Sequence, residues 1–596
     1  MIHRPQLLTD LQRLLPLLER DILDYGAGQP GLEAQLQAEY QAAQAASRTA
    51  LHFIEWRADL VTQAAAAWVL TCVFVRFLED NLLLPEPWLA GPGARLQHAK
   101  DRATVYFHEH PTHAERDYLL AVFAALEGLP AMGELLDRRH NPLWRLPLSA
   151  DGAKRLLDFF QRIDPASGVL VHDFSDPDWD TRFLGDLYQD LSEAARKRYA
   201  LLQTPEFVES FILDHSLTPA LEAFGLAQTR LIDPTCGSGH FLLGAFGRLF
   251  GAWQRREPAT NARELAQRAL GAIYGVDINP YAVAIARFRL LIAAMAAAGS
   301  TRLAQAPDFH FNLAVGDSLL HGRRFEWWWG NQGDLLDDPI RHVLEVEDKA
   351  LLARIFGRQY PVVVGNPPYI TVKDKALNQA YRNKYPTCHR QYSLGVPFTE
   401  RFFDLALPGE ANHPAGFVGL ITANSFMKRE FGKKLIEAYL PRKDLTHVID
   451  TSGAYIPGHG TPTVILFARN RPPVGERLRA VLGIRGEPST PEDPTQGLVW
   501  RSILDLLERP GSGNEFVSVA DPERALYGSH PWSLGGGGAA ELKVLIEENA
   551  PRVLSRMVDE IGFGAVTRED QVYLVGRKVC GRFGIPQQQV LPLAGR

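Results

Sequence analysis

Apolar residues in the first 200 positions recur every three or four residues, which is the spacing of one face of an α-helix. The spacing is clearest in LLTDLQRLLPLLERDIL and in FIEWRADLVTQAAAAWVLTCVFVRFLEDNLL. Leu, Ala, Gln and Glu are frequent there, and all four are compatible with helices. The pattern predicts a helical N-terminal domain over residues 1–200.

The pattern changes at about Leu201 to short β-branched runs that alternate with helical segments as far as about Asn470. The runs are RLIDPT, AIYGVDI, NLAVGD, YPVVVGN, GFVGLIT, LTHVIDT and TVILFAR. Such alternation predicts an α/β fold with a doubly wound, mostly parallel sheet over residues 201–470. The next stretch, 471–545, is dense in Pro, Gly and polar residues, which predicts a linker and a small subdomain.

Composition narrows the class of protein. The length of 596 residues predicts two to four domains, and 46% hydrophobic with 22% charged residues is ordinary for a soluble globular protein. Four cysteines without CxxC spacing favour a reducing cytoplasm over a disulfide scaffold or a zinc ribbon. The uncharged run Ala64–Val75 is too short to span a bilayer, so we expect a cytoplasmic protein without a membrane partner. A net charge of −6 argues against a uniformly basic nucleic-acid binder but permits local basic patches.

Three strand ends carry candidate binding residues. DPTCGSGHF at 233–241 lies between a strand and a helix, where glycines let the backbone approach a ligand, although an ordinary tight turn explains it equally well. Asp277 ends the next strand, where a carboxylate can accept the hydroxyls of a ribose. Asp317 ends a third strand, within plausible reach of an adenine amine. Each aspartate alone is more often a cap or turn residue, but three strand tips in order argue for a binding site.

A fourth strand ends in an unusual way, because VVVGNPPYI at 362–370 places Asn-Pro-Pro-Tyr directly after buried β-branched residues. TPEFVESFI, DPTCGSGHF, GVDINP, VGDSL and GNPPY occur in that order. Together they resemble the N6-adenine DNA methyltransferases that use S-adenosylmethionine (SAM), in which the cofactor motifs precede the catalytic one. The resemblance covers residues 200–470 and implies a Rossmann-like SAM-dependent methyltransferase core. The helical N-terminal region and the insertion before the catalytic motif further resemble the PglX-like methyltransferases of BREX phage-defence systems.

The resemblance implies a set of residues that bind SAM. They are Thr204, Pro205, Asp233, Pro234, Cys236, Gly237, Gly239, Phe241, Asp277, Ile278, Asp317, Ser318 and Asn366. We predict no metal site.

The resemblance also assigns chemistry to Asn366, Pro367, Pro368 and Tyr369. An adenine N6 amine is a poor nucleophile because its lone pair is delocalised into the ring. The side-chain oxygen of Asn366 and the carbonyl of Pro367 would hold its two hydrogens, and the prolines would make the loop rigid. Tyr369 would stack on the target base after it has left the duplex. A plain Pro-rich turn is the alternative.

A second aromatic wall for the base is not evident from the sequence. AYIPGHGTPTVILF at 454–467 resembles the late motif of the family, in which a Phe commonly precedes the proline. Ile456 stands at that position here, with Tyr455 beside it. Core packing is as good a role for Tyr455 as contact with the base.

Charged stretches give weaker signals. Between Thr371 and Arg390 there are five basic residues against one acidic, and between Met427 and Lys443 six against two. We expect the first stretch to contact DNA, while for the second a solvated helix face is equally plausible. The ExK triplets at 347–349 and 541–543 resemble nuclease signatures, but without strand context both are interpreted as solvated helix faces.

We therefore expect a site-specific adenine methyltransferase that acts on double-stranded DNA in a BREX-like or restriction-modification phage-defence system, together with other subunits. NPPY also occurs in enzymes that methylate protein glutamine or RNA, and a non-catalytic SAM-binding subunit is a further alternative. Residues 546–596 resemble the start of a target-recognition domain that is incomplete. This predicts a truncated protein or a separate specificity partner.

Overall fold

A computed structural model describes residues 2–191, 203–322, 347–410, 413–552, 556–558, 576–586 and 588. Residues 1–537 form one compact unit and residues 538–596 a second, and each is considered by itself. The second unit contains α20 (Ala539–Asn549) and α22 (Arg577–Arg582). IGFGAVTREDQVYL, the expected start of a target-recognition domain, lies outside the described residues.

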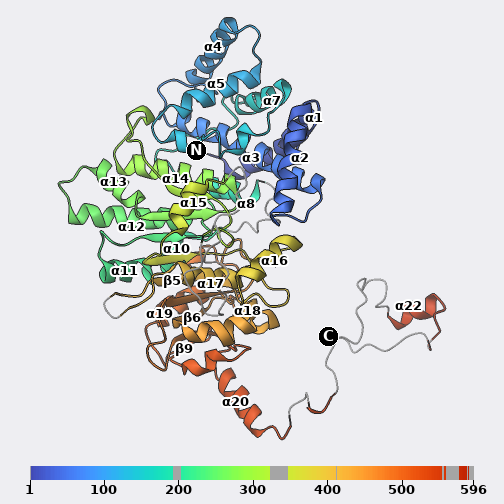
Figure 1. Ribbon diagram of the computed structural model, residues 1–596, viewed down its shortest axis with the longest axis vertical. Coiled ribbons are helices and arrows are strands. Elements are labelled where there is room, and N and C mark those ends of the chain that lie inside the picture. The colour runs from blue at the N-terminus through green and yellow to red at the C-terminus, as the bar shows by residue number, and fades with distance from the viewer. Residues whose placement is uncertain are drawn as a thin grey trace. The chain divides into compact units, whose positions relative to one another are not determined.

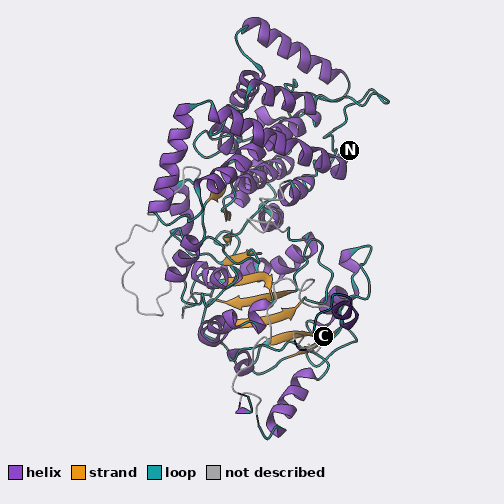
Figure 2. Ribbon diagram, turned by 90° about the vertical axis from the view of Figure 1, so that its right-hand side faces the viewer, coloured by secondary structure: helices purple, strands orange, loops and turns teal. Residues whose placement is uncertain are grey.

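The first 190 residues are helical, which confirms the prediction for this region (Figure 1). The helices are α1 (Arg4–Ala27), α2 (Pro30–Ala45), α3 (Phe53–Asp80), α4 (Ala94–Glu109), α5 (Glu115–Glu127), α6 (Met132–Leu135), α7 (Ala150–Phe160) and α8 (Phe183–Asp190). Figure 2 shows these helices packed together above the strands.

The central helix of this region, α3, is far longer than the uncharged run Ala64–Val75 within it. Within the part of the chain that the structure describes, two helices, α3 and α14 (Pro280–Ala297), are long and apolar enough to cross a membrane by length and composition. The run Ala64–Val75 was expected to be too short to span a bilayer, and this is wrong for α3, the helix that contains it. Most of the apolar window in each helix is buried, 83% in α3 and 72% in α14, as in the core helices of a folded domain.

The α/β part is built on one nine-stranded sheet. Its strands are β1 (Leu231–Asp233), β2 (Ile273–Asp277), β3 (Asn312–Val315), β4 (Val362–Gly365), β5 (Phe417–Ala423), β6 (Asp444–Asp450), β7 (Thr463–Arg469), β8 (Arg479–Gly483) and β9 (Val517–Ala520). They are ordered β3-β2-β1-β4-β5-β7-β6-β8-β9. The first five pair in parallel, whereas β7 runs antiparallel to both β5 and β6. The α/β, mostly parallel prediction is confirmed.

Helices cover both faces of this sheet. They are α10 (Glu206–Asp214), α11 (Leu217–Phe224), α12 (His240–Arg256), α13 (Ala262–Leu270), α14, α15 (Lys349–Phe356), α16 (Lys375–Lys384), α17 (Gly395–Leu405), α18 (Ser425–Lys428) and α19 (Leu498–Leu506). Val362 and Val364 pack into the core that includes α12 and α14, and Val363 packs into the core on the other face. A run of three valines is thus fully buried because neither face of β4 meets solvent.

The strand order reverses at β1, which lies between β2 and β4. In doubly wound sheets the crevice at such a reversal, outside the carboxyl ends of the strands, is the usual ligand site. The motifs that follow β1, β2, β3 and β4 are therefore brought to one edge of the sheet. They lie up to 136 residues apart in the sequence, from Asp233 to Tyr369.

Candidate cofactor and target-base site

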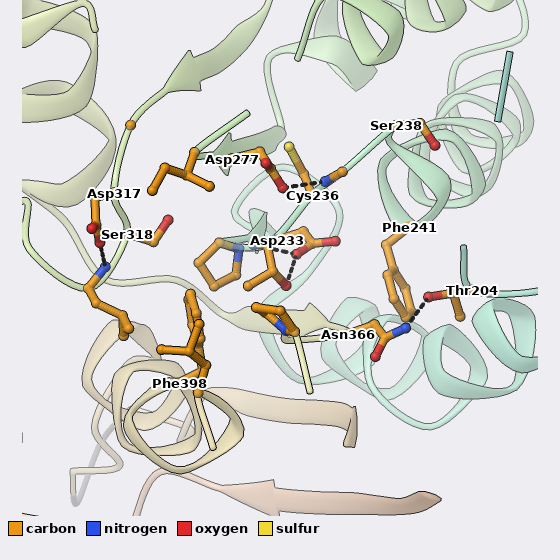
Figure 3. Close-up of a pocket in the computed structure, with 18 of the residues that line it drawn as sticks. Thr204, Asp233, Cys236, Ser238, Phe241, Asp277, Asp317, Ser318, Asn366 and Phe398 are labelled. Carbon is orange, nitrogen blue, oxygen red and sulfur yellow. Dashed lines mark hydrogen bonds between the residues drawn. The ribbon is translucent and has the colours of Figure 1, made fainter. Parts of the chain in front are cut away.

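One pocket lies at this edge of the sheet and is lined by residues that follow four strands. Figure 3 shows Asp317 toward one side, Asp277 and Asp233 near the middle, and Asn366 with Thr204 toward the other side. The expected cofactor residues and the expected catalytic asparagine therefore share one cavity.

The turn after β1 forms the floor of the pocket. Asp233 Oδ1 accepts hydrogen bonds from the backbone N–H of Thr235 at 2.8 Å and from its hydroxyl at 3.0 Å. Gly237 and Gly239 both have positive φ angles, +51° and +85°. A Cβ on Gly239 would lie 3.0 Å from the Cβ of Ala286, so this glycine also lets α12 approach α14 closely.

Asp277, at the end of β2, faces the same turn. Its Oδ2 accepts a hydrogen bond from Gly237 N–H at 2.9 Å, and its Oδ1 accepts one from Asn279 N–H at 2.8 Å. Burial raises the pKa of Asp277 to about 6 and that of Asp233 to about 7. Buried carboxylates with raised pKa values gain from polar or cationic ligand groups, because such groups restore the solvation lost on burial.

Asp317 marks the far end of the pocket. Its Oδ1 accepts hydrogen bonds from Leu319 N–H and Leu320 N–H at 2.9 and 3.0 Å, and its Oδ2 accepts one from the Tyr381 hydroxyl at 2.6 Å. The apolar side chains of Ile278, Leu394 and Phe398 line the same pocket. An aspartate beside apolar surfaces suits a planar ring that carries an amine.

At the opposite end of the pocket, residues of the NPPY segment contact Thr204 and His459. Asn366 donates from Nδ2 to Thr204 Oγ1 at 3.2 Å, and its Oδ1 accepts a hydrogen bond from the Tyr369 hydroxyl at 2.6 Å. The Tyr369 ring meets the His459 ring edge to face, with centroids 5.8 Å apart and planes at 86°. His459 Nε2 lies 3.1 Å from the carbonyl oxygen of Gln203, next to Thr204, and so donates to it.

This contact and the burial of His459 determine which nitrogen of its ring carries a hydrogen. Burial lowers its pKa, so the ring is neutral near pH 7. Because Nε2 carries the hydrogen that it donates to Gln203, Nδ1 is left as an acceptor, and it is buried with no partner among the described residues.

Most of the residues expected from the sequence line the pocket. They are Thr204, Asp233, Pro234, Cys236, Gly237, Phe241, Asp277, Ile278, Asp317, Ser318, Asn366 and Pro368. Four others lie outside the lining: Pro205 precedes α10, Gly239 precedes α12, and Pro367 and Tyr369 flank Pro368.

Several lining residues were not predicted from the sequence, among them Tyr381, Leu394 and Phe398. Tyr381 lies in the basic stretch 371–390, and no local pattern separates its inward ring from the charged residues around it. The late motif also differs from expectation, since Ile456 is 4% exposed and belongs to the core. The ring that meets Tyr369 belongs to His459, three residues later.

The structure corrects the interpretation of one charged stretch and buries a single basic residue of another. Glu347 of the first ExK triplet is not on a solvated helix face, because its side chain is 2% exposed and pairs with Arg48 and His321. Its neighbour Asp348 caps α15 through Leu351 N–H. In the stretch 427–443, Lys443 is buried and donates to Asn470, so its charge is unavailable to DNA.

Comparison with known proteins gives consistent matches. Residues 271–456 match the family described as Eco57I restriction-modification methylase. The adenine-specific methyltransferase PglX of Streptomyces coelicolor is 48% identical over 97% of this chain and 49% of its own length. The type II methyltransferase M.XhoI of Xanthomonas vasicola is 26% identical over 67% of this chain and 63% of its own. The solved DrdV–DNA complex matches 80% of this chain and 42% of that chain, with 14% identity and a TM-score of 0.48. The chain thus spans about half the length of PglX.

Proposed function

We propose that this chain transfers a methyl group from SAM to the N6 amine of an adenine in DNA. The proposal starts from the match of residues 271–456 to the Eco57I restriction-modification methylase family and from the similarity of the chain to adenine-specific methyltransferases. The observation that carries the proposal is the pocket itself, which Asp277, Asp317 and Asn366 line together, with Asp317 toward one side, Asp277 near the middle and Asn366 toward the other side in Figure 3.

The lining residues include polar and apolar side chains that suit the ribose and the adenine ring of SAM. Asp277 would accept the ribose hydroxyls, while Asp317, Ile278 and Phe398 would hold the adenine ring. Gly365 supports this fit, because a Cβ there would lie 2.6 Å from Asp233 Oδ1 and crowd the floor of the pocket. When bound, SAM supplies an electrophilic methyl group on a positively charged sulfur.

Asn366 would act on the target amine. Its Oδ1 is the acceptor expected to hold an N6 hydrogen, and the contact of its Nδ2 with Thr204 holds the amide in place. Together with the Pro367 carbonyl it would favour a nitrogen whose lone pair is available for attack, which helps most in the transition state. The proton lost from the amine would leave through these acceptors to water.

Tyr369 would give up the hydrogen bond from its hydroxyl to Asn366 when the target base enters the pocket. In the structure its hydroxyl already donates to Asn366 Oδ1, so the amine must replace it there. Tyr369 would then stack on the flipped base, and His459 would form the adjoining wall in place of the aromatic residue expected at 456.

The cellular role follows from the relatives. We propose a cytoplasmic protein that acts on double-stranded DNA in a BREX-like or restriction-modification defence system with further subunits. Methylation of protein glutamine or of RNA uses the same clamp and is the alternative, and the adenine-specific relatives favour DNA.

Long-read sequencing of host DNA tests the proposal. We expect N6-methyladenine at one sequence motif in cells with the gene, and its loss in cells that lack it. An Asn366→Ala allele at normal protein level should behave like the deletion, because it removes the acceptor while leaving the cofactor residues in place. A methylation pattern unchanged by both the deletion and Asn366→Ala would refute the function.

A further inference from the structure

The segment that joins α2 to α3 contacts the methyltransferase part at two carboxylates. Arg48 donates from Nη1 and Nη2 to the two carboxylate oxygens of Glu347 at 3.4 and 3.1 Å. Thr49 donates from its hydroxyl to Asp374 Oδ2 at 3.0 Å, and Ala50 N–H donates to the same oxygen at 2.7 Å. We call residues 48–50 the arm contact. In Figure 1, α16, which begins after Asp374, lies below α1 and α2 on the right of the view.

Asp374 connects the arm contact to helix α16. Its Oδ2 holds Thr49 and Ala50, while its Oδ1 caps the helix through Ala376 N–H at 2.9 Å and Leu377 N–H at 3.1 Å. Helix α16 carries Tyr381, whose hydroxyl donates to Asp317 in the pocket. A single carboxylate thus fixes both the arm and the start of the helix that covers the adenine end of the pocket.

Glu347 makes the second connection between the arm contact and Asp317. His321 Nε2 lies 2.9 Å from Glu347 Oε1, and the backbone N–H of His321 donates to the Asp317 carbonyl at 2.9 Å. The Arg48 and Glu347 side chains are 6% and 2% exposed. A buried ion pair of this kind contributes little net stability, but losing one partner is costly, so it fixes geometry more than it stabilises.

We propose that the arm contact positions the cofactor site, so that docking of residues 48–50 and binding of SAM favour each other. This rests on the proposed function in that the ligand is SAM. One chain of contacts runs from the arm contact through Glu347 and His321 to Asp317. Another runs from the arm contact through Asp374 and Tyr381 to the same residue, Asp317. Because coupling between two sites is reciprocal, SAM holds the arm in place as strongly as the arm improves SAM binding. Arg48 and Thr49 are positioning residues and do not line the pocket.

Calorimetric titration of the full chain with SAM tests the coupling in the absence of DNA. Thr49→Val removes the hydroxyl donor without burying an unpaired charge, and we expect SAM to bind about threefold to fivefold more weakly, near the lower end of usual coupling. Arg48→Met should weaken binding tenfold or more. The matched control is Arg57→Met, which breaks the Arg57–Glu33 ion pair elsewhere in the helical region and should leave SAM affinity unchanged.

Hydrogen exchange supplies a readout that a merely structural role would not move. Saturating SAM should slow exchange of the amides at 48–52 in the wild type, and the slowing should shrink in Thr49→Val. Failure of the wild type to bind SAM would refute the proposed function itself. If the wild type binds SAM and folded Thr49→Val and Arg48→Met bind it equally well, the coupling is refuted. Should Arg48→Met fail to fold, Thr49→Val alone decides the question.

Discussion

The candidate catalytic residue, Asn366, already has both ends of its amide occupied. Thr204 takes its Nδ2 hydrogen, and the Tyr369 hydroxyl occupies its Oδ1. Asn366 is half-buried, so the Tyr369 contact stabilises the site when no base is present. Substrate binding then exchanges one hydrogen bond for another instead of filling an unsatisfied site.

Asp277 predicts a pH dependence of cofactor binding. Its pKa is raised to about 6 by burial, and the ionised carboxylate is the form that accepts ribose hydroxyls. SAM affinity should therefore be full well above pH 6 and fall about tenfold per pH unit below it. The folding stability of the free protein changes in the opposite direction. Because the pKa of Asp277 is higher in the folded than in the unfolded chain, its contribution to stability grows as the pH falls. Calorimetry from pH 5 to 8 measures the first effect.

The control for this prediction is Asp277→Asn. It keeps the size of the side chain, binds SAM weakly at every pH, and should lose the part of the pH dependence centred near 6. A wild type whose SAM affinity is the same at pH 5 and pH 8 would contradict the role of Asp277.

At the scale of elements, the packing around a strand end decides whether the pocket can form. Strand β4 ends at Gly365, and a Cβ there would lie 2.6 Å from Asp233 Oδ1, 2.7 Å from Thr235 Oγ1 and 3.0 Å from the Phe402 ring. Asp233 and Phe402 are buried, so the strand and the turn after β1 must move apart if this residue has a side chain. The close approach of β4 to β1 therefore depends on this glycine.

Gly365→Ala should destabilise the protein by about 1–3 kcal/mol, the usual cost of overpacking a core, and weaken SAM binding. Thermal melting followed by circular dichroism gives the first effect and calorimetry the second. Gly460→Ala is the matched control, since a Cβ there meets no atom within 4 Å. Equal melting temperatures for the two variants would contradict the predicted crowding.

At the scale of the whole molecule, the helical region and the sheet share one hydrophobic core. Phe74 of α3 stacks on Phe288 of α14, with ring centroids 4.3 Å apart and an interplanar angle of 13°. Both rings are buried, and the same core continues to Val362 and Val364 of the central strand. Residues of α3 thus stabilise the part of the sheet that holds the pocket, as expected for one compact unit over residues 1–537.

Phe74→Ala should lower the free energy of unfolding by about 3–5 kcal/mol, because it opens a cavity between two buried rings. Since the core is continuous, loss of far-ultraviolet circular dichroism and loss of SAM binding should occur at the same denaturant concentration. Two separate transitions, with the helical region unfolding first and SAM still bound, would contradict a shared core.

The sequence by itself determined the elements and the kinds of side chain that end them. Apolar spacing of 3.6 or 2 residues is a local property, so the helices of the first 190 residues and the strands β1 to β4 could be predicted. Asp233 and Asp277 are the last residues of their strands, while Asp317 and Asn366 lie within two residues of a strand end. Parallel strands bring their carboxyl ends to one edge. Motif order then indicated the family.

Only the tertiary structure decided which distant residues complete the pocket. Tyr381 and Phe398 lie on helices after the NPPY segment, and His459 lies in the loop before β7, so no local spacing relates them to the strand ends. Burial likewise depends on what packs above a residue, which is why Glu347 resembles a solvated charge in sequence yet pairs with Arg48, 299 residues away. Long-range contacts of this kind arise from the folding of the whole chain, and short-range patterns carry no record of them.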